Sequence, residues 1–250
     1  MIAHDLSGVP ISDAHCLIVW GHGWGHNRQA FSALIQSVSQ RAAHLAIDFP
    51  GFGQSAPPPE TWTTADYADD VAELLKPYRS IKKIIWVGHS FGGRVGIQLA
   101  ARHPELVDGL FLIAAAGLPR QRPFVENVRY LTRLYLFKFL KRIVPLLGIS
   151  VDSLRKKFGS ADYKSAGPLR KVFVNVISED LSEQAKIINC PVQLIYGEND
   201  REASPDIGER LVKLMSHAEL VILPGQDHYS VLGEGRHPVV KRLANFMENV

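Results

Sequence analysis

The residue pattern with the clearest capacity for chemistry is a serine set between glycines. The run Gly88-His89-Ser90-Phe91-Gly92 follows an apolar segment that predicts a strand and precedes a helical pattern that begins at residue 93. Glycines at both ends permit a tight turn, which would lift the Ser90 hydroxyl above the strand. Because a serine hydroxyl is a weak nucleophile at neutral pH, it also needs a base, an acid that orients the base, and donors for an oxyanion. A glycine-flanked serine can also be an ordinary turn, so these other parts decide its interpretation.

Candidates for the acid and the base follow two later strand patterns. Asp200 comes just after the apolar run 192–196, and His228 follows the last such run, 220–223. Catalytic residues of open α/β sheets gather at the carboxyl ends of the strands. Glu198 is the rival for the acid, whereas Asp227 is expected to serve a turn. The chain order serine, aspartate, histidine predicts that Ser90, Asp200 and His228 act together.

The glycine-rich run 21–25 is the candidate for the oxyanion donors. It follows the apolar run 17–20, and the backbone N–H groups of Trp24 and Phe91 are the expected pair. A phosphate-binding loop is the alternative, but the sequence has neither a GxGxxG nor a GxxxxGK[ST] pattern. His22 and His89 are expected to be structural, and His26 has no assigned role. Because no Cys or His spacing is typical of metal ligands, we expect no metal. Hydrolysis by a serine nucleophile requires no cofactor, so none is expected.

The elements that must position these residues alternate along the chain. Apolar runs predict strands at 17–20, 45–47, 84–87, 110–113, 192–196 and 220–223, and helical patterns lie at 30–41, 64–75, 93–102, 205–215 and 239–247. This alternation predicts an α/β fold, with a mostly parallel central sheet and helices on both faces. Between residues 117 and 174 the pattern becomes helical. We therefore expect a core of residues 1–116 and 175–250 with an inserted helical cap, 117–174.

Composition and charge narrow the class and suggest partners. The 250 residues are 46% hydrophobic and 21% charged, which is typical of a soluble globular protein. The net charge of +3 hides a cap segment with thirteen basic and three acidic residues. This charge either faces water or attracts an acidic carrier protein or an anionic surface. Nucleic acid is not expected because no recognition motif accompanies the charge. No apolar stretch is long enough to span a bilayer, and the start of the chain lacks a secretory pattern, so a cytoplasmic location is expected.

The motifs together resemble the α/β-hydrolase superfamily over nearly the whole length. The matching pieces lie, in order, at 22–25, 48–55, 88–93, 197–200 and 227–228. The resemblance implies a helical cap, the triad Ser90, Asp200 and His228, and a place for loop 48–55 at the mouth of the site. It disfavours relatives with an aspartate nucleophile, because the turn carries Ser90. Relatives often begin with an antiparallel pair of strands, which the short segment before Cys16 predicts to be shortened or missing.

The expected activity is hydrolysis of a carboxylic ester, a small molecule, through an acyl-enzyme. Hydrolysis of a carbon-carbon bond in a diketone-type substrate is an alternative, since the same triad would serve. A non-catalytic ligand receptor on the same fold is another, because a fold does not determine a function. The carrier-protein hypothesis is linked to a similarity of the oxyanion loop and loop 48–55 to those of the pimeloyl-carrier methyl esterases.

Overall fold

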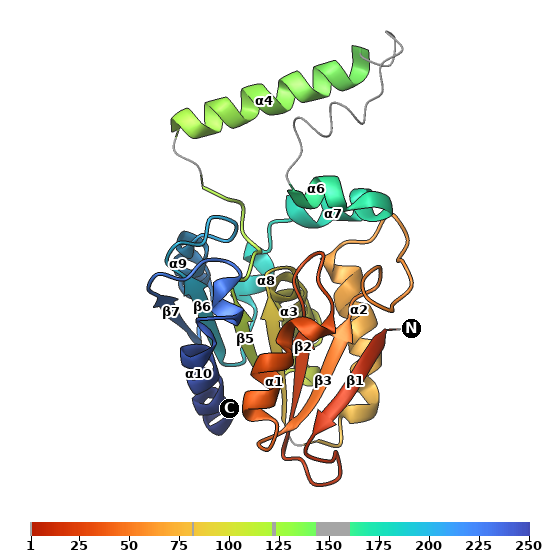
Figure 1. Cartoon of the computed structure of the whole chain (residues 1–250), viewed down its shortest axis with the longest axis vertical. Helices are drawn as coiled ribbons and strands as arrows, with labels where there is room; N and C mark the ends of the chain where they lie inside the picture. The colour runs from red at the N-terminus through yellow and green to blue at the C-terminus, as the bar shows by residue number, and fades with distance from the viewer. Residues whose placement is uncertain (1, 82, 122–123, 144–160) are drawn as a thin grey trace.

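One seven-stranded sheet forms the centre of the computed structural model, which describes residues 2–81, 83–121, 124–143 and 161–250 (Figure 1). Its order is β1-β3-β2-β4-β5-β6-β7, and all neighbours are parallel except β1 and β3. The predicted fold class is thereby confirmed. The strands are β1 Ala3–Gly8, β2 Cys16–Gly21, β3 Ala43–Asp48, β4 Lys83–His89, β5 Gly109–Ile113, β6 Val192–Gly197 and β7 Ala218–Leu223.

Helices cover both faces of this sheet. On one face lie α1 (Ser32–Val38) and α10 (Arg236–Asn249). The other face is covered by α2 (Thr64–Leu75), α3 (Phe91–Arg102), α8 (Ser182–Lys186) and α9 (Pro205–Leu214). Strands β2, β3, β5 and β6 are buried along their whole length. Burial on both faces explains why their sequences are continuous apolar runs rather than alternating ones.

Strand β1 corrects the expected set of six strands. It pairs antiparallel with β3, from Ala3 opposite Asp48 to Gly8 opposite Ala43. All of its residues after Ala3 are exposed, and Leu6 is its only large apolar side chain. An edge strand of this kind has no apolar run, so the pattern that reveals buried strands cannot find it. The antiparallel pair of strands that often precedes the first parallel strand was expected to be shortened or missing. Here a single strand, β1, stands in its place and pairs with β3.

The segment expected to form the cap is mostly helical where the structure describes it, apart from residues 117–121. It contains α4 (Phe124–Ile143), α6 (Ala161–Ser165) and the beginning of α7 (Arg170–Ser178), so the expected boundary after residue 174 lies within α7. In Figure 1, α4 lies beyond the carboxyl ends of the parallel strands, with α6 and α7 between it and the sheet. Residues 144–160, with the basic residues Arg155, Lys156 and Lys157, lie outside the described residues. Within the described part of the chain, no helix combines the length and apolar character needed to cross a membrane.

Candidate active site

Ser90 stands in a strained turn between β4 and α3. Its backbone has φ 50° and ψ −104°, a left-handed conformation that a residue with a side chain rarely adopts. The Ser90 N–H donates to the carbonyl of Ile113 on the next strand at 3.0 Å. A Cβ atom on Gly92 would lie 1.9 Å from the Gly21 carbonyl oxygen, and one on Gly88 would lie 2.4 Å from that of Gly92. The glycines at both ends are therefore required by direct backbone contact.

The glycine-rich loop after β2 lies against this turn. The Gly92 N–H donates to the His22 carbonyl at 3.1 Å, and the N–H groups of Gly93 and Arg94 donate to the Ser90 carbonyl. Among the described residues, no acceptor is found for the N–H groups of Trp24 and Phe91. The Phe91 group is one of the unpaired donors at the positive end of α3. Two unused donors thus flank Ser90, where the sequence places the oxyanion pair.

Asp200 and His228 meet through a buried hydrogen bond at the same edge of the sheet. The His228 Nδ1–H donates to Asp200 Oδ2 at 2.7 Å, and both side chains are almost completely buried. Asp200 Oδ1 accepts from the N–H groups of Glu202 and Ala203, each at 2.8 Å. These bonds fix the carboxylate, which in turn holds the imidazole in the tautomer whose Nε2 can accept a proton.

The two competing acids have other partners. Glu198 is exposed, and its carboxylate accepts from the N–H of Gly225 at 3.0 Å. Asp227 Oδ1 accepts from the N–H groups of Tyr229 and Ser230 at 3.0 and 2.8 Å, which closes a turn. Of the three candidates for the acid, Asp200 is therefore the one hydrogen-bonded to His228 Nδ1.

Two further histidines are buried and neutral. His22 Nε2 accepts from the Phe49 N–H at 3.1 Å, and Nδ1 donates to the Gly23 carbonyl at 2.8 Å. His89 Nε2 donates to the His228 carbonyl at 3.0 Å, and the two rings are 4.9 Å apart. Burial lowers the pKa of His22 to about 4 and that of His89 to about 3. His89 thus has the structural character expected of it, and it joins the end of β4 to the loop that carries His228.

Ser90 lines a pocket of about 210 Å³ together with Trp24 and Phe91. No hydrogen bond joins its hydroxyl to His228 in the part of the chain that the structure describes, and such bonds are often long before a substrate binds. The sequence reasoning did not identify Arg94 and Glu202, which also line the pocket. The Glu202 carboxylate is 3.6 Å from His228 Nε2. The sequence signal that could have identified them is their spacing: Arg94 follows Ser90 by four residues, and Glu202 follows Asp200 by two.

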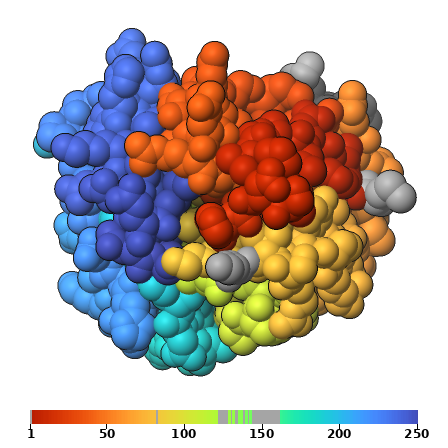
Figure 2. All heavy atoms as spheres, turned by 90° about the horizontal axis from the view of Figure 1, so that it is seen from below, coloured from red at the N-terminus to blue at the C-terminus, as the bar shows by residue number. Residues whose placement is uncertain are grey.

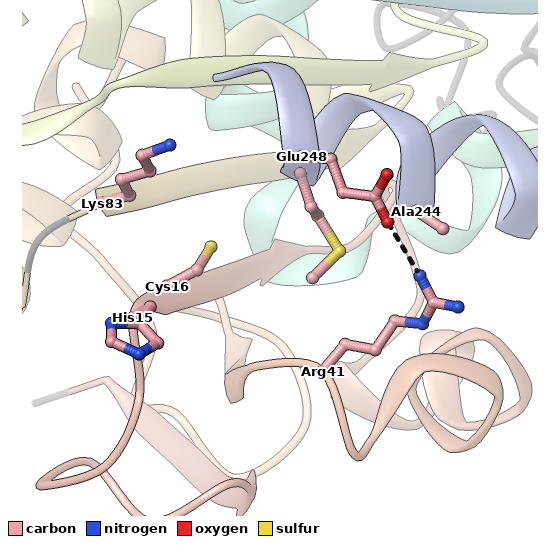
Figure 3. A pocket seen from close by; sticks show the side chains of 7 residues that line it. His15, Cys16, Arg41, Lys83, Ala244 and Glu248 are labelled. Atoms are coloured by element: carbon pink, nitrogen blue, oxygen red, sulfur yellow. Dashed lines mark hydrogen bonds and ion pairs between the residues drawn. The ribbon is translucent and has the colours of Figure 1, made fainter.

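A larger hollow of about 500 Å³ lies at the opposite edge of the sheet, where β2 and β4 begin (Figure 3). Cys16 is in its wall, with His15, Lys83 and the Arg41–Glu248 ion pair. Burial raises the pKa of the Cys16 thiol to about 11, so the thiol stays protonated and is a poor nucleophile. Figure 2 views the molecule from this side, where α10 (blue) lies close to α1 (orange). No group of His, Cys, Asp and Glu suited to a metal ion occurs among the described residues.

Comparisons with known proteins agree with this architecture. A model of the alpha/beta hydrolase family matches residues 18–242. The 2-(acetamidomethylene)succinate hydrolase of Mesorhizobium japonicum is 26% identical, and the match covers 93% of this chain and 88% of that protein. The solved enol-lactonase of Burkholderia xenovorans superposes with a TM-score of 0.72 at 22% identity, over 99% of this chain and 96% of the other. A lipase-esterase related protein of Clostridium acetobutylicum superposes with a TM-score of 0.74 at 18% identity, over 98% and 99% of the two chains.

Proposed function

Because the chain belongs to the alpha/beta hydrolase family, we propose that it is a serine hydrolase that cleaves a carboxylic ester through an acyl-enzyme on Ser90. The observation that carries the proposal is the buried bond from His228 Nδ1 to Asp200, at the sheet edge where Ser90 stands in its strained turn. A ligand receptor would need neither this orientation of the imidazole nor the strain at Ser90.

In the proposed reaction the Ser90 hydroxyl attacks the ester carbonyl while His228 Nε2 removes its proton. The Trp24 and Phe91 N–H groups stabilise the negative charge that develops on the carbonyl oxygen. His228 then protonates the leaving alcohol, and the acyl group stays on Ser90. Water, deprotonated by His228, releases the acid and restores the serine. Asp200 orients the imidazole throughout.

The names of the related proteins include different substrates, so they support hydrolysis more directly than any one ester. The relative from Mesorhizobium is named for a substituted succinate, and the solved structures include an enol-lactonase and a lipase-esterase related protein. An ester is proposed because the unused donors and the base suit attack on a carbonyl. The division into core and cap, the cytoplasmic location and an acidic carrier protein or anionic surface as a partner remain proposals from the sequence.

A fluorophosphonate probe tests the nucleophile, and short-chain 4-nitrophenyl esters test the reaction. We expect one label per chain, on Ser90 by peptide mapping, and ester turnover that disappears in Ser90→Ala. Folded protein that takes up no label would exclude a serine nucleophile. Labelling without turnover of any ester would favour the carbon-carbon hydrolase or the receptor instead.

A further inference from the structure

Arg94 is a buried guanidinium one helical turn beyond Ser90. It lies in the first turn of α3, is only 7% exposed, and lines the same pocket as Ser90. Ser90 is the residue just before this helix, and its side chain and that of Arg94 line the same pocket. Arginine is among the residues least often buried unless it is paired.

Most of the hydrogen-bonding capacity of Arg94 is unused. A guanidinium has five N–H donors, and in the described part of the chain only Nη1 is engaged, with the Glu179 carbonyl at 3.3 Å. No described carboxylate lies within ion-pair distance of it. The nearby Glu179 carboxylate is already engaged, because it accepts from the backbone N–H of Thr64 at 2.8 Å and from the Thr64 hydroxyl.

The surroundings of Arg94 strengthen its need for an anion. The pocket wall is mostly apolar, formed by the side chains of Trp24, Phe91, Ala116, Phe173, Val176, Ile177 and Ala203. Burial lowers the pKa of Arg94 from its usual value, and the nearby charges of Glu179 and Asp180 oppose this without forming an ion pair with it. Two acids also line the pocket, Asp162 and Glu202, but the Glu202 side chain is 51% exposed and its charge is therefore screened by water.

The position of His228 indicates which part of a substrate meets Arg94. His228 must protonate the leaving alcohol, so the alcohol leaves on the His228 side of Ser90. Within the described part of the chain, the pocket is lined by Ser90 and Arg94 but not by His228. The pocket also extends toward His228, because Glu202 lines it and lies 3.6 Å from His228 Nε2, so only the part beside Arg94 is assigned to the acyl group, which remains bonded to Ser90 in the acyl-enzyme.

We propose that Arg94 binds a carboxylate on the acyl group, so that the substrate is a monoester of a dicarboxylic acid. A forked pair of N–H···O bonds from a guanidinium to a carboxylate is strong and directional, and it would use the idle donors. This proposal rests on the proposed ester hydrolysis at Ser90.

Matched esters test it in the Ser90→Ala chain, where binding can be measured without turnover. The probes are the monomethyl esters of succinic and glutaric acid, each paired with a neutral methyl ester in which an isopropyl group replaces the carboxylate. Titration calorimetry should show tighter binding of the carboxylate ester by about 10- to 100-fold, the range of a hydrogen bond to a charged group. If each carboxylate ester bound no more tightly than its neutral counterpart, the proposal would be overturned, and no Arg94 variant would be needed to decide it.

Variants of Arg94 identify the source of the preference. Arg94→Gln in the Ser90→Ala chain should abolish it, and Arg94→Lys should keep part of it because the charge remains while the fork is lost. The control is Arg102→Gln, on the same helix but exposed and paired with Asp69, which should keep the full preference. If Arg94→Gln fails to fold by thermal melting, the lysine variant decides. A preference that survives in the folded variant overturns the role of Arg94.

Failure of this proposal is distinguishable from failure of the proposed function. Ser90-dependent turnover of the neutral ester with no carboxylate preference would remove only the role of Arg94. A carboxylate preference that depends on Arg94, in a chain without Ser90-dependent turnover or labelling, would instead establish the anion site and remove the ester hydrolase.

Discussion

The two edges of the parallel sheet carry similar sets of residues in different arrangements. At the carboxyl edge, Ser90 lines a pocket of about 210 Å³, and His228 and Asp200 lie at the same edge. At the amino edge, Cys16 lies in a hollow of about 500 Å³ with His15 and Glu248 nearby (Figure 3). Both edges thus hold a nucleophile, a histidine, a carboxylate and open space.

The two edges differ in how their residues are hydrogen-bonded. The volume of the hollow does not identify the site, because the larger hollow lies at the amino edge. At the carboxyl edge the carboxylate is buried and bonded to the imidazole, and backbone N–H groups beside Ser90 are left without acceptors. At the amino edge Glu248 pairs with Arg41 in an exposed ion pair, and the Cys16 thiol is held protonated by burial. A residue inventory is therefore a weaker sign of a site than the partners of each residue.

The largest expected effect compares the two nucleophiles. Ser90→Ala should lower kcat for a 4-nitrophenyl ester by about 10⁴- to 10⁶-fold, because the acyl group loses its attachment point. Cys16→Ala is the matched variant at the other edge and should leave kcat unchanged. Steady-state kinetics on both purified variants measures this, and a large loss in the cysteine variant would contradict the distinction between the edges.

The next effect compares the carboxylates. Asp200→Asn should lower kcat by about 10⁴-fold, because an amide no longer fixes the tautomer of His228 that can act as a base. Glu198→Gln and Glu248→Gln are the controls, since neither carboxylate contacts His228. Steady-state kinetics compares the three variants. If Glu198→Gln lowered kcat more than Asp200→Asn did, Glu198 and not Asp200 would be the acid.

Ion pairs at the two edges should differ in stability by a smaller amount. Asp48 is buried at the end of β3, pairs with Arg28, and accepts from the Gln54 N–H at 2.9 Å. Asp48→Ala should lower the free energy of unfolding by about 3 to 5 kcal/mol, because it leaves a buried arginine with less compensation. Glu248→Ala breaks only an exposed pair and should cost less than about 1 kcal/mol. Urea unfolding followed by circular dichroism gives both values, and comparable losses would show that burial does not set the difference.

The smallest effect concerns acid stability. The pKa of His89 is lowered to about 3, below the ordinary value near 6.5, so between these values the unfolded chain binds a proton that the folded chain does not. Stability should therefore fall as the pH drops from about 6 toward 4, by up to about 1.4 kcal/mol per pH unit for one such histidine. His89→Gln should reduce the slope of unfolding free energy against pH, whereas His15→Gln, at the other edge and exposed, should not. Identical slopes in wild type and His89→Gln would refute this account.

The core was predictable from sequence where burial left a plain signal. All six predicted strands are present. Five of them, β2 to β6, are buried parallel strands, which read as uninterrupted apolar runs, whereas β7 was found from its apolar sequence although it lies at the sheet edge. Strand β1 was missed because its residues are exposed at the sheet edge. The motifs placed Ser90, Asp200 and His228 on one edge, since the carboxyl ends of parallel strands share it.

The sequence could not predict which side chains hydrogen-bond or pair with each other in the folded chain. The engagement of Glu198 with the Gly225 N–H depends on how two loops lie after folding, and no local pattern encodes it. Arg94 has no ion pair because the carboxylate of Glu179, 85 residues away, is bonded to Thr64, and only the Glu179 carbonyl accepts from Arg94. Long-range pairing of this kind, rather than residue type, distinguishes a charge on a surface from a charge in a pocket.

The left-handed turn at Ser90 also sets a limit on how well the active chain can fold. Its backbone conformation costs on the order of 1 to 3 kcal/mol for a residue with a side chain, and the rest of the core must compensate for it. Selection for thermal tolerance alone would favour glycine at this position, which under the proposed mechanism removes the nucleophile. Activity and robustness therefore make opposite demands on one residue, and a screen for hardier variants should be run together with an assay for turnover.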